Sequence, residues 1–144
     1  MTMKKIMFSV LAIFVSTVLG SCRERPVSFE QLPVAAKTFV SMNFADDKVV
    51  LAKLDDDLIR PDYEVYLSSG VELTFNHSGA LEKVSSRGTI SPDLIPVSIR
   101  EYVSAHYPTA GYREYEIGRR TYEVTLTNGI ELKFNSTFHL VEID

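Results

Sequence analysis

Apolar and polar residues alternate in the same way in two stretches of the chain, residues 63–76 and residues 122–135. The first reads YEVYLSSGVELTFN and the second YEVTLTNGIELKFN, with nine of the fourteen positions identical. Alternation of this kind is typical of a β-strand with one buried face. Two such runs on either side of a glycine predict a β-hairpin. The chain therefore contains a duplicated hairpin.

The register of the hairpin follows from the requirement that its apolar residues share one face. Opposing Leu67 with Val71 meets this requirement and leaves a three-residue loop. The loop ends at Gly70 in the first copy and Gly129 in the second, where glycine suits a left-handed position. The outward positions then pair as Tyr66 with Glu72, Glu64 with Thr74, Thr125 with Glu131, and Glu123 with Lys133, the last an expected ion pair.

A helical segment precedes each hairpin and begins after a proline, which suits the first turn of a helix. Apolar residues at i, i+3, i+4 and i+8 follow Pro33 and form one stripe of an amphipathic helix: Ala36, Phe39, Val40 and Phe44. The same stripe follows Pro96: Ile99, Tyr102, Val103 and Tyr107. The helical segments are thus duplicated together with the hairpins.

Further strands are predicted on both sides of each hairpin, at residues 49–54 and 81–85 in the first copy and at residues 112–117 and 140–144 in the second. Each repeat is then one helical segment followed by a four-stranded antiparallel sheet. The first repeat occupies residues 28–86 and the second occupies residues 91–144. The expected fold class is α+β, with two tandem repeats.

The last strand of each repeat has two possible orientations. If Val84 and Ile143 point into the core, Leu81 and Leu140 lie on the outward face; the opposite assignment exchanges them. We adopt the first assignment, which adds Leu81 and Leu140 to the outward residues of the hairpins.

Residues 1–21 are typical of an export signal, because two lysines precede an apolar run over residues 6–19 that is too short to span a bilayer. The run ends in Leu-Gly-Ser before Cys22, as in a bacterial lipobox. Cys22 is therefore expected to carry a lipid, and residues 22–27 to form a tether. The alternative is a free cysteine beside an ordinary cleavage site. The lipid predicts a cell-envelope location facing the periplasm, with surface exposure as the alternative.

The composition adds two constraints. Cys22 is the one cysteine in the sequence, so the domain must fold without disulfides. A unit of about 60 residues buries only about 60% of its unfolded surface, so the two repeats are expected to pack as one body. Without the signal, 13 basic and 19 acidic residues give a net charge of −6. This charge opposes binding to nucleic acid, and contact with the membrane is expected only through the lipid.

The duplicated pattern of Leu/Ile-Pro, an amphipathic helix and YEVxLxxGxELxFN resembles the PepSY-like, β-lactamase-inhibitor-like family of bacterial exported lipoproteins. The resemblance covers roughly residues 29–144. It implies a tandem α+β fold whose two sheets form a curved surface. Inhibitory proteins of similar architecture grip a target enzyme with such a surface. They also carry disulfides, which this chain lacks, and no stretch of this chain matches an inhibitory loop residue by residue.

Candidate chemistry is sparse. No motif of a hydrolase, a zinc peptidase or a phosphate-binding loop is present. His77, His106 and His139 lie in unrelated places, without the spacing of a metal site. The acidic run of residues 55–57, with Asp62, lacks the alternate spacing and glycine of a calcium loop. We therefore expect no enzymatic activity and no cofactor.

Two classes of function remain. The first is a non-enzymatic extracytoplasmic lipoprotein that binds another envelope or secreted protein through the open face of its sheet, with inhibition of that protein as a narrower version. Its contacts would be Glu64, Tyr66, Glu72, Thr74, Leu81, Glu123, Thr125, Glu131, Lys133 and Leu140. The second is a periplasmic sensor of a small ligand or calcium, using the acidic run or a crevice between the repeats.

Overall fold

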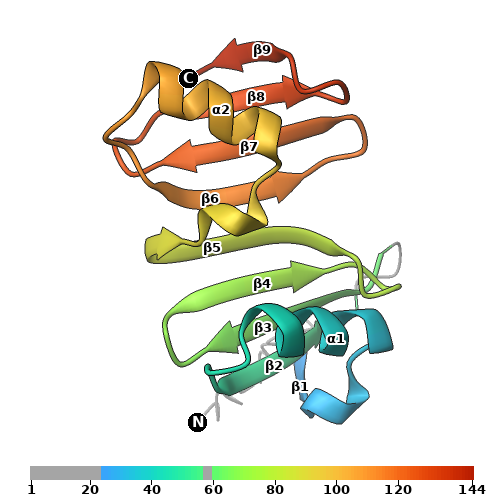
Figure 1. Ribbon diagram of the computed structural model, residues 1–144. Coiled ribbons are helices and arrows are strands. Elements are labelled where there is room, and N and C mark those ends of the chain that lie inside the picture. Colours follow the sequence, from blue (N-terminus) through green and yellow to red (C-terminus); the bar gives the residue numbers. More distant parts are fainter. Residues whose placement is uncertain (1–23, 57–59) are drawn as a thin grey trace, which may run out of the picture.

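Residues 24–56 and 60–144 are described by the computed structural model, and they form nine strands and two α-helices (Figure 1). No helix among them is long and apolar enough to cross a membrane. The order of elements is β1 (Glu24–Val27), a 3-10 turn η1 (Phe29–Gln31), α1 (Val34–Asn43), β2 (Val49–Asp55), β3 (Asp62–Leu67), β4 (Val71–Phe75), β5 (Leu81–Ile90), a second 3-10 turn η2 (Pro92–Leu94), α2 (Val97–His106), β6 (Tyr112–Ile117), β7 (Thr121–Leu126), β8 (Glu131–Asn135) and β9 (Leu140–Ile143).

The strands described form one antiparallel sheet in sequence order, from β1 at one edge to β9 at the other. The two repeats meet where β5 pairs with β6, with Lys83 opposite Glu116 and Val84 opposite Tyr115. The two four-stranded sheets expected from the repeats are thus a single nine-stranded sheet. A separate sheet in each repeat would expose two more edges with unpaired backbone groups. Pairing β5 with β6 removes both.

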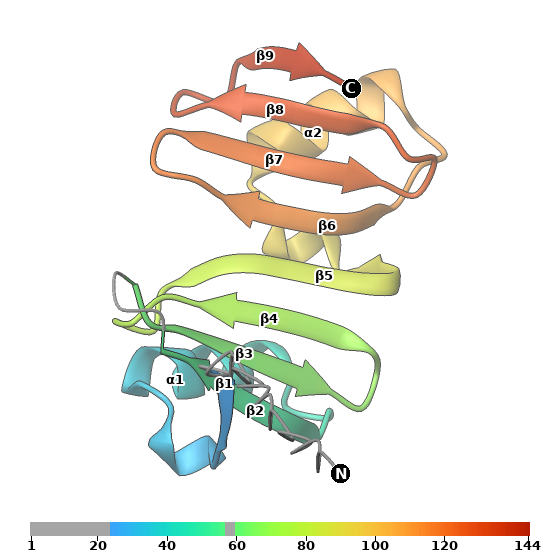
Figure 2. The same ribbon diagram turned by 180° about the vertical axis from the view of Figure 1, so that it is seen from behind.

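Both helices lie on the same face of the sheet, α1 over the first repeat and α2 over the second (Figures 1 and 2). Equivalent aromatic contacts fix them there. The ring of Phe39 packs edge-on against Phe75 at 5.7 Å, and that of Tyr102 against Phe134 at 5.5 Å. The hydrophobic core fills the space between helices and sheet. We call the opposite face, which the helices leave uncovered, the open face.

The hairpins have the predicted register. Tyr66 lies opposite Glu72 in the first, and Glu123 lies opposite Lys133 in the second. Gly70 has φ 90° and Gly129 has φ 88°. This is the left-handed conformation required by the three-residue loop. The expected ion pair is confirmed, with 2.9 Å between Lys133 Nζ and Glu123 Oε1.

The asparagine that ends each hairpin also has a structural role. Asn76 Oδ1 accepts hydrogen bonds from the backbone N–H groups of Ser78 and Ala80, both at 3.0 Å. Asn135 Oδ1 does the same for the N–H groups of Thr137 and His139. These bonds replace backbone partners in the turn that leads to the next strand. The repeated asparagine is therefore explained by the fold.

The start of the domain differs from the prediction. Residues 24–27 are not a tether but strand β1, which pairs with β2 and places Val27 opposite Ala52. Val27 packs against the core, so apolar burial and backbone pairing both hold this segment in place. The predicted lipid-bearing residue, Cys22, and the signal lie outside the described residues.

A β-bulge corrects the predicted orientation of Leu81 and Leu140. Leu81 pairs with Phe75 while Lys83 pairs with Thr74, so one extra residue lies in β5. Because the bulge changes the alternation, Leu81 and Val84 both face the core. The same irregularity pairs Leu140 with Phe134 in the second repeat, and Leu140 also packs against the core. The prediction that the two leucines lie on the open face is wrong.

Candidate binding surface on the open face

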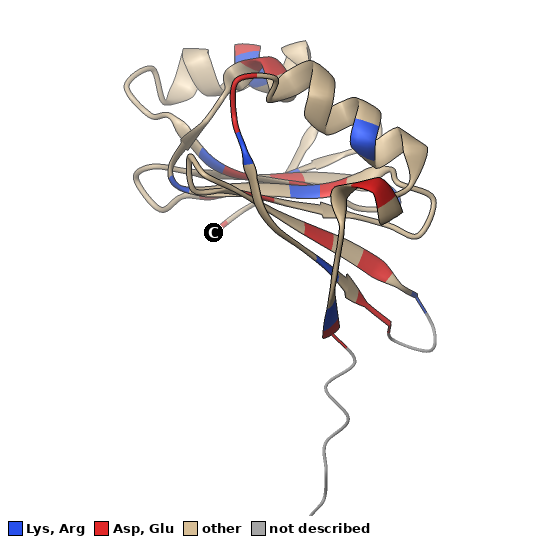
Figure 3. Cartoon of the chain, turned by 90° about the horizontal axis from the view of Figure 1, so that it is seen from below, with Lys and Arg blue, Asp and Glu red and all other residues tan. Residues whose placement is uncertain are grey.

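Two rows of largely polar side chains cross the sheet on the open face, because directly opposed residues of neighbouring strands point to the same side. The first row is Leu51, Tyr66, Glu72, Ser85, Glu114, Thr125 and Glu131. The second is Lys53, Glu64, Thr74, Lys83, Glu116, Glu123, Lys133 and Glu142. The charged positions are visible along the strands in Figure 3. The eight hairpin residues predicted to face outward are all in these rows.

Tyr66 is the aromatic residue of the first row, and charged groups surround it. Its hydroxyl donates a 2.7 Å hydrogen bond to Glu64 Oε2. Lys53 Nζ lies 5.3 Å from the centre of its ring and 3.4 Å from Glu24 Oε2. The hydrogen bond to Glu64, partial burial and the nearby carboxylates raise the pKa of Tyr66 to about 12. Tyr66 is therefore a neutral hydrogen-bonding group at physiological pH.

Ion pairs tie neighbouring strands of the open face together. Lys133 Nζ bridges Glu123 at 2.9 Å and Glu142 at 3.2 Å. These hydrogen-bonded partners raise the pKa of Lys133. Lys83 Nζ lies 2.8 Å from Glu114 Oε1. Burial alone would lower the pKa of Lys83, but the hydrogen bond and charge of Glu114, with the nearby charges of Glu116 and Glu72, raise it. Both lysines are therefore held in their charged form.

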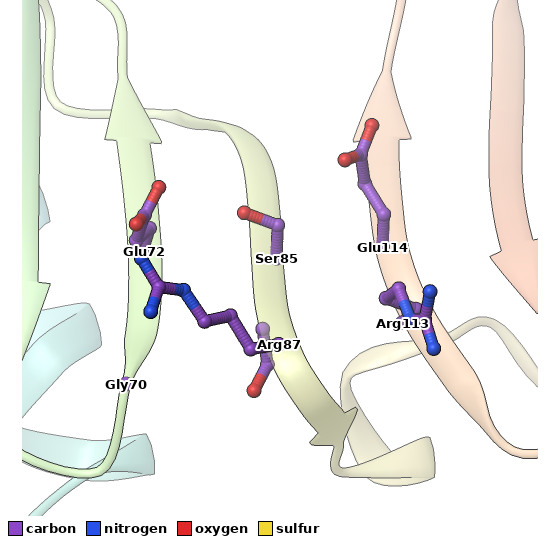
Figure 4. A pocket seen from close by; sticks show the side chains of 7 residues that line it. Gly70, Glu72, Ser85, Arg87, Arg113 and Glu114 are labelled. Atoms are coloured by element: carbon purple, nitrogen blue, oxygen red, sulfur yellow. The ribbon is translucent and has the colours of Figure 1, made fainter. Parts of the chain in front are cut away.

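Two hollows adjoin each other at the boundary between the repeats. One, of about 400 Å³, is lined by Gly70, Glu72, Ser85, Ser86, Arg87, Arg113 and Glu114 (Figure 4). The other, of about 340 Å³, is lined by Glu64, Tyr66, Glu72, Leu73, Thr74, Lys83, Ser85 and Glu114. They share Glu72, Ser85 and Glu114, which are consecutive residues of the first row. Together they form a shallow trough over β5.

Several residues of this trough were not among the predicted contacts: Lys83, Ser85, Arg87, Arg113 and Glu114. They belong to β5 and β6, the strands that join the repeats. Lys83 and Ser85 alternate with the buried Val84, and this pattern in the sequence could have placed both residues in the trough. Pairing of β5 with β6 could not be inferred from the hairpins, because it is a contact between repeats.

The described residues offer little for metal chemistry. No three His, Cys, Asp or Glu side chains among residues 24–56 and 60–144 lie close enough together to hold a metal ion. His106 stacks on Tyr102 with the ring centres 4.0 Å apart, and its Nδ1 lies 2.9 Å from the carbonyl oxygen of Tyr102. His139 Nδ1 lies 2.8 Å from Thr137 Oγ1. These contacts give His106 and His139 local structural roles.

These features define a class of α+β protein in which duplicated helix-and-hairpin units share one sheet and leave one face open. The chain belongs to the PepSY-like family: a family model described as "Putative beta-lactamase-inhibitor-like, PepSY-like" matches residues 16–83 and 61–142. No curated protein matches it.

Solved structures from two Bacteroides species are similar to the chain. A "putative calcium-regulated periplasmic protein" from Bacteroides thetaiotaomicron is 35% identical, with a TM-score of 0.81, over 84% of this chain and 96% of its own. A "putative periplasmic protein" from Bacteroides vulgatus is 33% identical, with the same TM-score of 0.81, over 87% of this chain and 99% of its own. A second "putative periplasmic protein" from Bacteroides vulgatus is 29% identical, with a TM-score of 0.79, over 84% of this chain and 98% of its own.

Proposed function

We propose that this chain is a non-enzymatic protein of the bacterial cell envelope, anchored by a lipid on Cys22, that binds another envelope protein through its open face. The observation that carries the proposal is the pair of polar rows that crosses both repeats without interruption, with Tyr66 in one of them. The periplasmic descriptions of its relatives support the location. Inhibition of the partner rests on the family description alone, and fold does not determine function.

Physical properties of the open face suit such a role. Interfaces often contain an aromatic side chain among polar groups, and tyrosine is frequent among the residues that dominate affinity. Tyr66 is held by its bond to Glu64 and by Lys53, so little side-chain freedom is lost when a partner covers it. The described strands of both repeats belong to one sheet, which holds the two polar rows in place relative to each other. A preorganised surface of this kind binds at a lower entropic cost.

Affinity capture from membrane extracts, with residues 24–144 as bait, tests the proposal. Tyr66→Ala is compared with Val97→Ala, which alters an exposed residue of α2 on the opposite side of the sheet. We expect one envelope protein to be recovered with the wild type and with Val97→Ala. Its apparent affinity should fall about tenfold or more with Tyr66→Ala, as expected for an aromatic anchor. Equal binding by all three baits would exclude Tyr66 from the interface.

The lipid anchor is tested separately in the full chain. Cys22→Ser removes the thiol that would be acylated, so we expect the protein to move from the membrane fraction to the soluble periplasmic fraction. Retention of the variant in the membrane fraction would contradict anchoring through Cys22.

A calcium sensor is the second candidate, favoured by the description of one relative as calcium-regulated. A ligand that binds only the folded state stabilises it, by about 2.7 kcal/mol at a concentration 100 times its Kd. If the chain senses calcium, the midpoint of thermal unfolding should rise by several degrees in millimolar calcium, and magnesium provides the control. An unchanged midpoint would remove calcium binding from consideration.

A further inference from the structure

The larger hollow contains two arginines on a face that is otherwise rich in carboxylates. Arg87 belongs to β5 and extends toward Glu72 of β4, whereas Arg113 belongs to β6 on the other side of β5 (Figure 4). Gly70 keeps one side of the hollow open, because nothing lies within 4 Å of the position that a Cβ would take there. The side chains of both arginines can therefore be approached from solvent.

Neither guanidinium group makes an ion pair or a hydrogen bond within residues 24–56 and 60–144. Glu114, the nearest carboxylate along the chain from Arg113, is instead bound to Lys83 at 2.8 Å. The lining of the hollow itself has two arginines and two glutamates, Glu72 and Glu114, and Lys83 from the adjoining hollow compensates Glu114. Counted with Lys83, this group of side chains has a net charge of +1. The chain without its signal has a net charge of −6. The hollow is thus a cationic spot on an acidic protein.

We propose that Arg87 and Arg113 form a carboxylate-binding site that receives an aspartate or glutamate side chain of the protein partner, an inference that rests on the proposed function. Guanidinium groups pair with carboxylates through two parallel hydrogen bonds, which makes them selective for this planar group. The hydroxyl of Ser85 lines the same hollow and is a further donor. Glu72 disfavours a phosphate, which carries close to two negative charges, more than it disfavours a singly charged carboxylate.

The test uses purified protein and a small probe, so that it does not depend on finding the partner. N-acetylglutamate amide, which has one side-chain carboxylate, is titrated while the arginine Nε–H signals are followed by NMR. The neutral N-acetylglutamine amide is the control probe, with ionic strength held constant. We expect saturable shifts of the Arg87 and Arg113 signals with the carboxylate probe only. Arg119 lines a different hollow and serves as the reference signal. The proposal would be overturned if the Arg87 and Arg113 signals shifted linearly with probe concentration and by the same amount as the Arg119 signal.

Substitution of an arginine and substitution of Glu72 should change the affinity for the probe in opposite directions. Arg87→Gln or Arg113→Gln should weaken binding of the probe about tenfold, the usual effect of losing a charge-assisted hydrogen bond, while Arg119→Gln leaves it unchanged. Glu72→Gln should tighten binding, because it removes the opposing charge. Inorganic phosphate is the second probe. If phosphate binds more tightly than the carboxylate probe, the assignment as a carboxylate site is wrong. If the probe binds as expected but no protein is captured, the proposed function fails and the carboxylate site stands.

Discussion

Lys83 on β5 and Glu114 on β6 form a 2.8 Å ion pair across the boundary between the two repeats. The pair is diagonal, because Ser85 is the residue directly opposite Glu114 and Lys83 lies opposite Glu116. It therefore reinforces a junction whose strands already pair through their backbones. The same lysine lines the trough over β5, so one side chain serves both the continuity of the sheet and the candidate binding surface.

We expect Lys83→Gln to reduce the free energy of unfolding by at most about 1 kcal/mol at pH 7, because both partners are partly exposed to solvent. The pKa of Lys83 is raised above its ordinary value of 10.5 in the folded protein. Its contribution is therefore complete below that value and is lost as the pH rises through the raised pKa. Urea unfolding of both proteins at pH 7 and at about pH 12 measures the difference. A difference that grows at high pH would contradict this interpretation.

The tyrosines offer a second pH measurement. The pKa of Tyr66 is about 12 mainly because its hydroxyl donates to Glu64, whereas burial raises the pKa of Tyr115 to about 12. Glu64→Ala should lower the pKa of Tyr66 toward 10 and leave that of Tyr115 unchanged. NMR of ¹³Cζ-labelled tyrosine resolves the two titrations. Equal shifts of both residues would mean that the variant disturbs the fold rather than the hydrogen bond.

Folding stability should respond to the same two tyrosines. Above pH 10 the unfolded chain releases their protons before the folded protein does, since their folded pKa values are about 12. The free energy of unfolding should therefore fall between pH 10 and about pH 12. In Glu64→Ala the fall should be smaller, because the pKa of Tyr66 then lies closer to that of the unfolded chain. Urea unfolding over this range checks the prediction.

The hairpins could be predicted closely because their information is local. Period-two alternation determines which residues share a face, and a glycine in the left-handed conformation determines the loop length. Together these predicted the pairs of Tyr66 with Glu72 and Glu123 with Lys133. Eight of the ten predicted contact residues lie on the open face for this reason.

The features that could not be predicted arise from contacts between repeats and from interrupted alternation. Pairing of β5 with β6 depends on two edges that meet in space, and no short motif encodes it. The bulge in β5 inserts one residue, so an apolar residue three positions before Val84 shares its face. Strict alternation assigns Leu81 to the opposite face. The arginines of the larger hollow also lie at irregularities: Arg113 in β6 between Tyr112 and Glu114, and Arg87 in β5 between Ser85 and Ile90.

The corrected position of Leu81 leads to a test that separates stability from binding. Leu81 is half-buried and packs against the core. Leu81→Ala should therefore reduce the free energy of unfolding by about 2 kcal/mol, at the low end of the range for buried leucines. Capture of the partner by the folded variant should be unchanged. Tyr66→Ala should show the reverse, with weaker capture and little loss of stability. Weaker capture by folded Leu81→Ala would place this residue at the interface after all.

The turn after the first hairpin lies directly under α1, so little space is left for a side chain in place of Gly79. A Cβ on Gly79 would lie 2.8 Å from Pro33 Cβ and 2.9 Å from the backbone nitrogen of Ala36, at φ +85°. Gly70→Ala is the matched control, since Gly70 has φ +90° and nothing within 4 Å. We expect Gly70→Ala to cost about 1–2 kcal/mol through the left-handed backbone alone. Gly79→Ala should cost about 1–3 kcal/mol more, because it also overpacks the helix.

Urea unfolding of the two variants isolates the packing term, because the backbone conformation is nearly the same in both. The second repeat has a side chain at the equivalent position. Phe138 occupies the position equivalent to Gly79 with φ 60°, and its ring stacks on Tyr122 at 4.9 Å. That aromatic contact offsets backbone strain in the second repeat. Equal costs for Gly79→Ala and Gly70→Ala would mean that α1 moves away to admit a methyl group, and that the helix is held less tightly than its contacts indicate.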